Sequence, residues 1–117
     1  MKRFWKTGSL IVVAGIVLAQ TSPEAGRFME AMNASMRQMD HEMMAAPMSG
    51  DVDHDFASMM IPHHQGAIDM AKAELSYGKD PVLRRLAQEI IVDQQSEIEA
   101  MRLRLQRLAN IAETERH

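Results

Sequence analysis

Two adjacent histidines near the middle of the chain are the residues best suited to chemistry. His63 and His64 follow Met59 and Met60, and Met70 comes one heptad after His63. Imidazole nitrogen and thioether sulfur form a borderline and soft ligand set, which selects Cu(I) over calcium or magnesium. Neighbouring residues of a regular helix point about 100° apart, so the spacing predicts one histidine that lines the core and one at its edge. The alternative is a pair of helix histidines that holds no ligand.

Methionines at steps of three and four residues form a second group, which precedes the histidines. They are Met29, Met32, Met36, Met39 and Met43, and the group is extended by His41, Met44 and Met48. If these side chains bind metal, they form a copper-collecting surface of lower affinity, whose candidate ligands are His41, Met39, Met43 and Met44. The chain has 12 Met beside 3 Phe, 1 Tyr and 1 Trp, so composition alone favours the alternative, in which methionine is the residue that fills the core.

Two polar residues interrupt the apolar stripe of the last predicted helix. Gln94 and Glu97 lie on the same helical face as Met101. Polar side chains in a core stripe cost free energy unless they find partners. We therefore predict that they hydrogen-bond a metal-ligating histidine or supply a ligand, as Met101 would. The alternative is a polar network that only fixes the register of the helices.

Composition excludes several classes of function. The chain has no Cys, which rules out disulfides, cysteine zinc sites and thiolate nucleophiles. The net charge of −3 gives no basic surface for nucleic acid. A ferritin-like di-iron site needs Glu-x-x-His motifs, and the sequence contains none. Zincin, phosphate-loop and nucleophile-elbow motifs are also missing, so we expect no enzyme. A pocket in which His63 or His64 lies within hydrogen-bonding distance of Glu97 and is open to solvent would instead favour an enzyme.

The first 19 residues have the pattern of a secretory signal peptide. Lys2, Arg3 and Lys6 precede an uncharged, mostly apolar stretch, residues 8–19, which ends in Val-Leu-Ala. The stretch is too short for a membrane-spanning helix, which needs about 20 apolar residues, although a retained anchor is the alternative. We therefore expect a periplasmic or secreted protein that begins near Gln20 and has no membrane contact after cleavage.

Start and stop signals outline three helices in the rest of the chain. The first is predicted over residues 23–45, after the capping residue Ser22 and before a loop at Pro47. The second starts among the acids at 51–55 and stops at Gly78, a residue suited to the left-handed position after a helix. Pro62 predicts a kink or a break beside the histidines. The third starts at Asp80-Pro81 and runs for about thirty residues.

The fold expected from these segments is all-α, an antiparallel helical bundle of three to four helices after the signal peptide. No stretch alternates apolar and polar residues as a strand would. The short connection between the second and third helices makes them a hairpin. We expect one domain, in which a Met-rich first helix and loop (20–50, helix 23–45) pack against a hairpin (51–113) that carries the His-His pair.

The run from Asp55 to Ala71, with its Met-Met-Ile-Pro-His-His-Gln-Gly-Ala-Ile-Asp-Met core, and the later group of Gln94, Glu97 and Met101 resemble a known family. The sequence is similar to the bacterial family called domain of unknown function three-zero-five, over about residues 51–108. The resemblance implies a ferritin-like bundle, usually exported, and some members are periplasmic copper-binding proteins linked to copper tolerance. Carried over by position, its motif residues are Met60, His63, His64, Met70, Gln94, Glu97 and Met101.

Together these observations predict an exported, non-catalytic protein that holds copper, with Cu(I) favoured and Ag(I) as a second cargo. The predicted metal ligands are His63, His64, Met60, Met59, Met70, Met101, His41, Met39, Met43 and Met44. A metal-exchange protein and a second copy of the chain are the partners left open. The alternative is a structural or stress-related helical module whose methionines only pack.

Overall fold

A computed structural model of the 117-residue chain describes residue 2 and residues 20–117. Apart from Lys2, the predicted signal peptide lies outside the described residues. The described residues form three helices and no strand, which are α1 (Pro23–Met44), α2 (Val52–Tyr77) and α3 (Pro81–Thr114). The predicted all-α fold is thereby confirmed.

Capping residues set the starts of the helices where the sequence predicts them. The side chain of Ser22 accepts a hydrogen bond from the Ala25 amide at 3.1 Å. Asp80 accepts from the amides of Val82 and Leu83 at 3.0 and 2.8 Å. These bonds satisfy amides that have no partner within the first turn of a helix.

The break predicted at Pro62 and the left-handed conformation predicted at Gly78 are both wrong. The helix runs without a break through Pro62, which is buried. Proline inside a helix costs about 3 kcal/mol, and packing against helices on both sides of α2 outweighs that cost. At the end of α2, Gly78 has a φ of −74° and a ψ of 154°, so the chain leaves the helix in an extended conformation and not a left-handed one. The positive φ belongs to Gly50, in the loop before α2.

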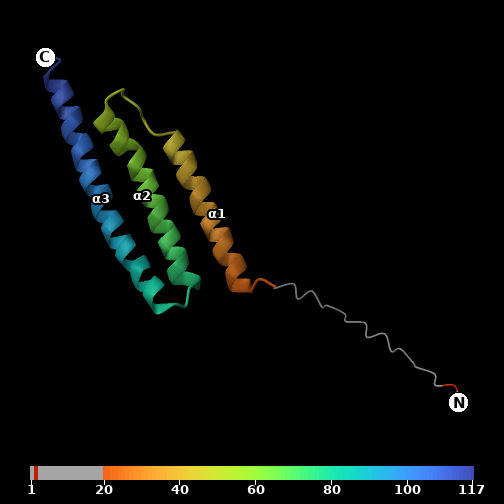
Figure 1. Cartoon of the computed structure of the whole chain (residues 1–117). Coiled ribbons are helices and arrows are strands. Elements are labelled where there is room, and N and C mark those ends of the chain that lie inside the picture. Colours follow the sequence, from red (N-terminus) through yellow and green to blue (C-terminus); the bar gives the residue numbers. More distant parts are fainter. Residues whose placement is uncertain (1, 3–19) are drawn as a thin grey trace.

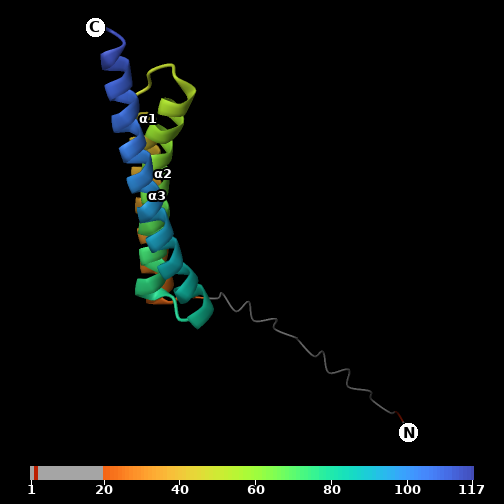
Figure 2. The ribbon, with the colours of Figure 1, turned by 90° about the vertical axis from the view of Figure 1, so that its left-hand side faces the viewer.

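The three helices lie side by side in one layer, with α2 in the middle (Figure 1). Both outer helices contact α2, and α1 and α3 do not contact each other. In the view turned by 90°, the three helices overlap, so the layer is one helix thick (Figure 2). Each helix is antiparallel to the next, as the short connections require.

The layer buries few side chains. Its buried hydrophobic residues are Ala57, Ile68, Ala71, Ala73, Ala87 and Ile98, and Ile68 is the one large side chain that is fully buried in the described part of the chain. Four of the six are alanines, so the helices approach closely but enclose little apolar volume. Many large apolar side chains remain at the surface, Phe56, Leu83 and Ile90 among them.

A carboxylate fastens the loop between α1 and α2. Asp55 accepts hydrogen bonds from the Ser49 amide at 2.7 Å and the Gly50 amide at 3.0 Å. Its Oδ1 also lies 2.9 Å from Nδ1 of His54. The Ser49 amide, then His54, then the Gly50 amide lower the pKa of Asp55 to about 2. The ionised form of Asp55 is thus the form that the folded loop favours.

The low pKa of Asp55 makes the loop sensitive to acid. Because the pKa lies below its usual 3.8, the stability that Asp55 contributes is present above that value and is lost as the pH falls toward about 2. In Asp55→Asn the free energy of unfolding should be lower at neutral pH and should fall less steeply in this acidic range. Urea unfolding at several pH values measures both effects. Asp53→Asn, a neighbouring exposed acid, is the control, and an identical acid dependence in both variants would contradict the assignment.

Candidate functional site

A hydrogen bond between α2 and α3 joins His64 to Glu97. Nε2 of His64 lies 2.5 Å from Oε2 of Glu97. The His64 side chain is 13% exposed, whereas that of Glu97 is 57% exposed. Glu97, one of the two polar residues in the apolar stripe of α3, thus pairs with His64. The other, Gln94, is half-buried on the same stripe.

The other ring nitrogen of His64 has no partner. Nδ1 is buried and makes no hydrogen bond with any described residue. Because a carboxylate accepts at Nε2, the neutral ring carries its proton there and presents a lone pair at Nδ1. Leaving such a group unsatisfied costs about 1–3 kcal/mol. A metal ion bound at Nδ1 would use that lone pair, and the carboxylate at Nε2 is the usual outer partner of a metal-bound histidine.

Two methionines share a level of the layer next to this pair. Met60 precedes His64 by one turn of α2, and Met101 follows Glu97 by one turn of α3. Since α2 and α3 are antiparallel and meet at His64 and Glu97, this register places the backbone of Met60 opposite that of Met101. Helical side chains lean toward the N-terminus of their own helix, so the His64 ring leans toward the level of the Met60 and Met101 backbones. Both methionines are half-buried.

His63 takes a different position from its neighbour. It is exposed, and its ring centroid lies 6.0 Å from that of His64 with the ring planes at 60°. This division into one inner and one outer histidine is the one that the helical spacing predicts. His63 shares its stripe of α2 with Met60, Ala67 and Met70. Met59 and Met70 are half-buried like Met60.

The methionines of α1 differ in their contacts and in their burial. Met39 packs onto Gly66 of α2, where an added Cβ would lie 2.7 Å from the Met39 sulfur and 2.9 Å from its Cβ. Met32 and Met43 are half-buried, while Met29 and Met36 are exposed. None of the methionines in the described residues is fully buried, so packing alone does not account for the whole group.

The structure does not bring the remaining candidates to the histidine pair. His41 lines a hollow with Ser58, Gln65 and Arg102, on the face of α2 opposite to the stripe of His63. Met44 is 89% exposed at the end of α1. His41 and Met44 therefore lie apart from the group of His64, Met60 and Met101.

Oxygen and nitrogen ligands alone do not form a site in the described part of the chain. No three His, Asp or Glu side chains converge there as a metal group. The nitrogen of His64 that Glu97 leaves free is buried from solvent.

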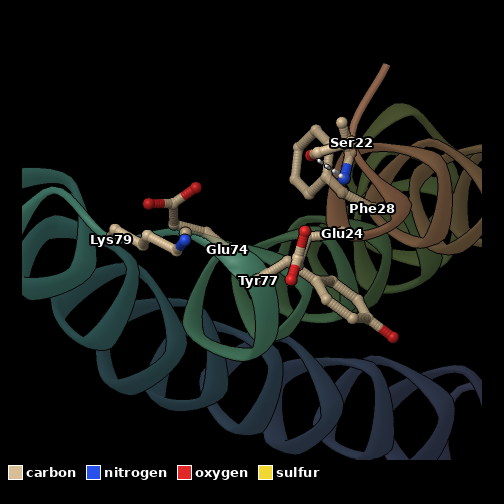
Figure 3. Close-up of a pocket in the computed structure, with 8 residues that line it drawn as sticks. Ser22, Glu24, Phe28, Glu74, Tyr77 and Lys79 are labelled. Carbon is tan, nitrogen blue, oxygen red and sulfur yellow. Dashed lines mark hydrogen bonds between the residues drawn. The ribbon is translucent and has the colours of Figure 1, made fainter. Parts of the chain in front are cut away.

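A hollow that the sequence did not single out lies where α1 begins and α2 ends (Figure 3). It measures about 430 Å³, and Phe28, Glu74, Tyr77 and Lys79 are among the residues that line it. At its rim, the backbone amide of Glu24, followed by Lys79, lowers the pKa of the Glu24 carboxyl. Ser22, the capping residue, was the one signal of this end of the layer in the sequence. The hollow holds none of the predicted ligands.

Comparisons with known proteins place the chain among relatives without an assigned activity. A family model described as "Domain of unknown function (DUF305)" matches residues 11–105. The chain is also similar to "Uncharacterized protein L153" of Acanthamoeba polyphaga mimivirus, with 45% identity over 49 residues. That match covers 42% of this chain and 32% of the viral protein, so the chain spans about a third of that relative. In the described residues, no helix has the length and apolar character needed to cross a membrane.

The contact of Met39 with Gly66 predicts opposite effects of one substitution at two glycines. Gly66→Ala forces the Cβ and Cγ of Met39 to move, and such overpacking costs about 1–3 kcal/mol. Gly26→Ala meets nothing within 4 Å and should stabilise α1 by about 0.5–1 kcal/mol. Thermal unfolding followed by circular dichroism measures both shifts. A melting temperature of Gly66→Ala at or above that of the unmodified chain would refute the close contact.

Proposed function

The chain belongs to the DUF305 family, whose description names no activity, and we propose from its own side chains that it is an exported protein that binds Cu(I) or Ag(I). Sequestration or delivery of the ion in metal tolerance is the role that suits such a protein. The observation that carries the proposal is the buried, unpartnered Nδ1 of His64, whose ring is held from the other side by Glu97.

The proposed ligand set combines one nitrogen with thioether sulfur. Nδ1 of His64 supplies the nitrogen, and Met60 and Met101 supply sulfur from the two helices that meet there. Thioethers and imidazole suit Cu(I), and a thioether does not form disulfides in an oxidising compartment as a thiol would. Glu97 orients the His64 ring and raises its basicity as a ligand.

Exposed candidate ligands, one next to this group and others on α1, give the ion a route in and out. His63 lies on the surface next to His64, and Met29 and Met36 are exposed on α1. Such groups bind a soft ion more weakly than a half-buried set does, because nothing holds them in one geometry. In the proposed function they collect the ion and exchange it with a partner protein. Export of the protein rests on the signal-peptide pattern of residues 1–19.

A structural module without metal is the second candidate, and the packing of Met39 on Gly66 favours it. In this view methionine is the residue that fills an irregular core. It differs from metal binding in one measurable way, because a ligand that binds only the folded state must raise the melting temperature. The two candidates are therefore separated by the effect of metal on stability.

The central prediction concerns the two histidines. In anaerobic titration against a Cu(I) chelator, the unmodified protein should compete and His64→Ala should lose competition, while His63→Ala retains part of it. Glu97→Gln should weaken the affinity about 10- to 100-fold, as loss of an outer partner does. A free ion concentration of 100 times the dissociation constant should stabilise the fold by about 2.7 kcal/mol.

His117→Ala, which removes an exposed imidazole at the chain end, is the matched control and should bind as the unmodified protein does. Failure of the unmodified protein to compete, together with an unchanged melting temperature, would favour the structural module and exclude the metal-binding proposal.

Replacing methionine by leucine separates ligation from packing. Leucine has a similar volume and no sulfur, so it keeps most packing energy. Met60→Leu and Met101→Leu should each weaken Cu(I) binding at least tenfold while the metal-free melting temperature changes little. Met39→Leu, at the Gly66 contact, should leave Cu(I) binding unchanged. Equal copper affinity in all three variants would show that neither Met60 nor Met101 supplies a ligand.

A further inference from the structure

One face of the layer is apolar and has no covering element in the described part of the chain. A groove of about 420 Å³ runs along it between α1 and α3, over the C-terminal half of α2. We call this surface the open face and define it by six residues that line the groove, Phe28, Met32, Met70, Leu83, Leu86 and Ile90. Glu74 is the one charged residue in the groove lining. The groove shares Phe28 and Glu74 with the hollow at the start of α1, so the two adjoin.

The opposite face of the layer has a different character. The hollow on that side is lined in equal parts by apolar residues and by polar ones, Glu42 and Arg102 among them, whereas the groove lining has one charged residue. The layer as a whole is therefore amphipathic, as a single helix at the surface of a bundle is. In such a helix the apolar side is the one that another element covers.

The layer by itself has too little core for a domain of this size. Its buried hydrophobic side chains are four alanines and two isoleucines, while Leu83, Leu86 and Ile90 are 54%, 41% and 42% exposed. A small domain without disulfides depends on its apolar core for stability. The apolar volume that the interior lacks is present on the open face.

We propose that a second copy of this chain covers the open face and that the two layers form a six-helix dimer. A two-fold axis pairs one surface with itself, so two faces of the same length that are both apolar are complementary without opposite charges. α2 has 26 residues and is about 39 Å long, and the outer axes are about 16–20 Å apart. The whole side of the layer on which the open face lies therefore measures on the order of 700 Å², close to the roughly 800 Å² per partner of a stable interface.

The dimer goes beyond the proposed function and does not depend on it. His63 and Met60 lie on the α2 stripe that continues into the groove through Ala67 and Met70. The dimer itself follows from the apolar face, and it forms without metal.

The mass of the metal-free protein in solution tests the proposal. The chain as purified should have the mass of two copies by light scattering at micromolar concentration. Ile90→Glu places a charge on the open face and should reduce the mass to one copy. Val92→Glu is the matched control, because Val92 is an aliphatic residue of the same helix, 64% exposed and on its outer side, and this variant should stay dimeric.

A cysteine scan makes the test independent of whether Ile90→Glu folds. The chain has no Cys, so a single introduced thiol reports one position. Ala67→Cys in the groove should cross-link two chains with a short bis-maleimide, and Lys72→Cys on the other side of α2 should not. A single-copy mass for the unmodified chain would overturn the proposal and leave the open face to another segment of the chain. A dimer that survives Ile90→Glu with native helicity would also overturn it, even where copper binding is intact.

Discussion

The central position of α2 constrains everything else in this fold. A helix with a neighbour on each side must present two packing surfaces, and α2 does so with small residues. Ala57 and Ala71 are buried toward α3, and Gly66 accepts Met39 from α1. Small residues let helix axes come close, but they contribute little apolar area, at about 25 cal/mol per Å² of buried surface. The large apolar side chains consequently remain on the open face of the layer.

The contact between His64 and Glu97 orients more than it stabilises. The Glu97 side chain is 57% exposed, and ion pairs or hydrogen bonds at such sites are screened by water and contribute little to the free energy of unfolding. The half-buried His64 ring is nevertheless fixed by it, with Nδ1 turned inward. A fold that orients a buried nitrogen and leaves it without a partner carries an energetic cost. That cost is offset when a ligand uses the nitrogen. The unpartnered Nδ1 of His64 is therefore stronger support for metal binding than the number of methionines.

Sequence patterns predicted the helices well because their boundaries are local. Ser22 and Asp80 precede prolines, and the helices begin at those prolines. The conformation of Gly78 and the continuity of α2 through Pro62 depend on packing with neighbours, and both local predictions there were wrong. The family is also shown by sequence, since its model matches residues 11–105. Periodicity placed Glu97 on the inner face of its helix but could not say which turn of α2 it meets, because register is set by the whole helix pair.

The arrangement of the helices in one layer also depends on packing between helices, which local sequence signals do not specify. In the sequence, the stripe with Met60 and His63 and the stripe with Ile61 and His64 have the same heptad spacing, and both predict a covered surface. The structure gives the second stripe a neighbour in the same chain and leaves the first on the open face. Apolar spacing shows that a surface is covered and does not identify what covers it. If copper binds the dimer more tightly than the single layer, linkage requires that copper strengthen dimerisation by the same factor, because both equilibria share that surface.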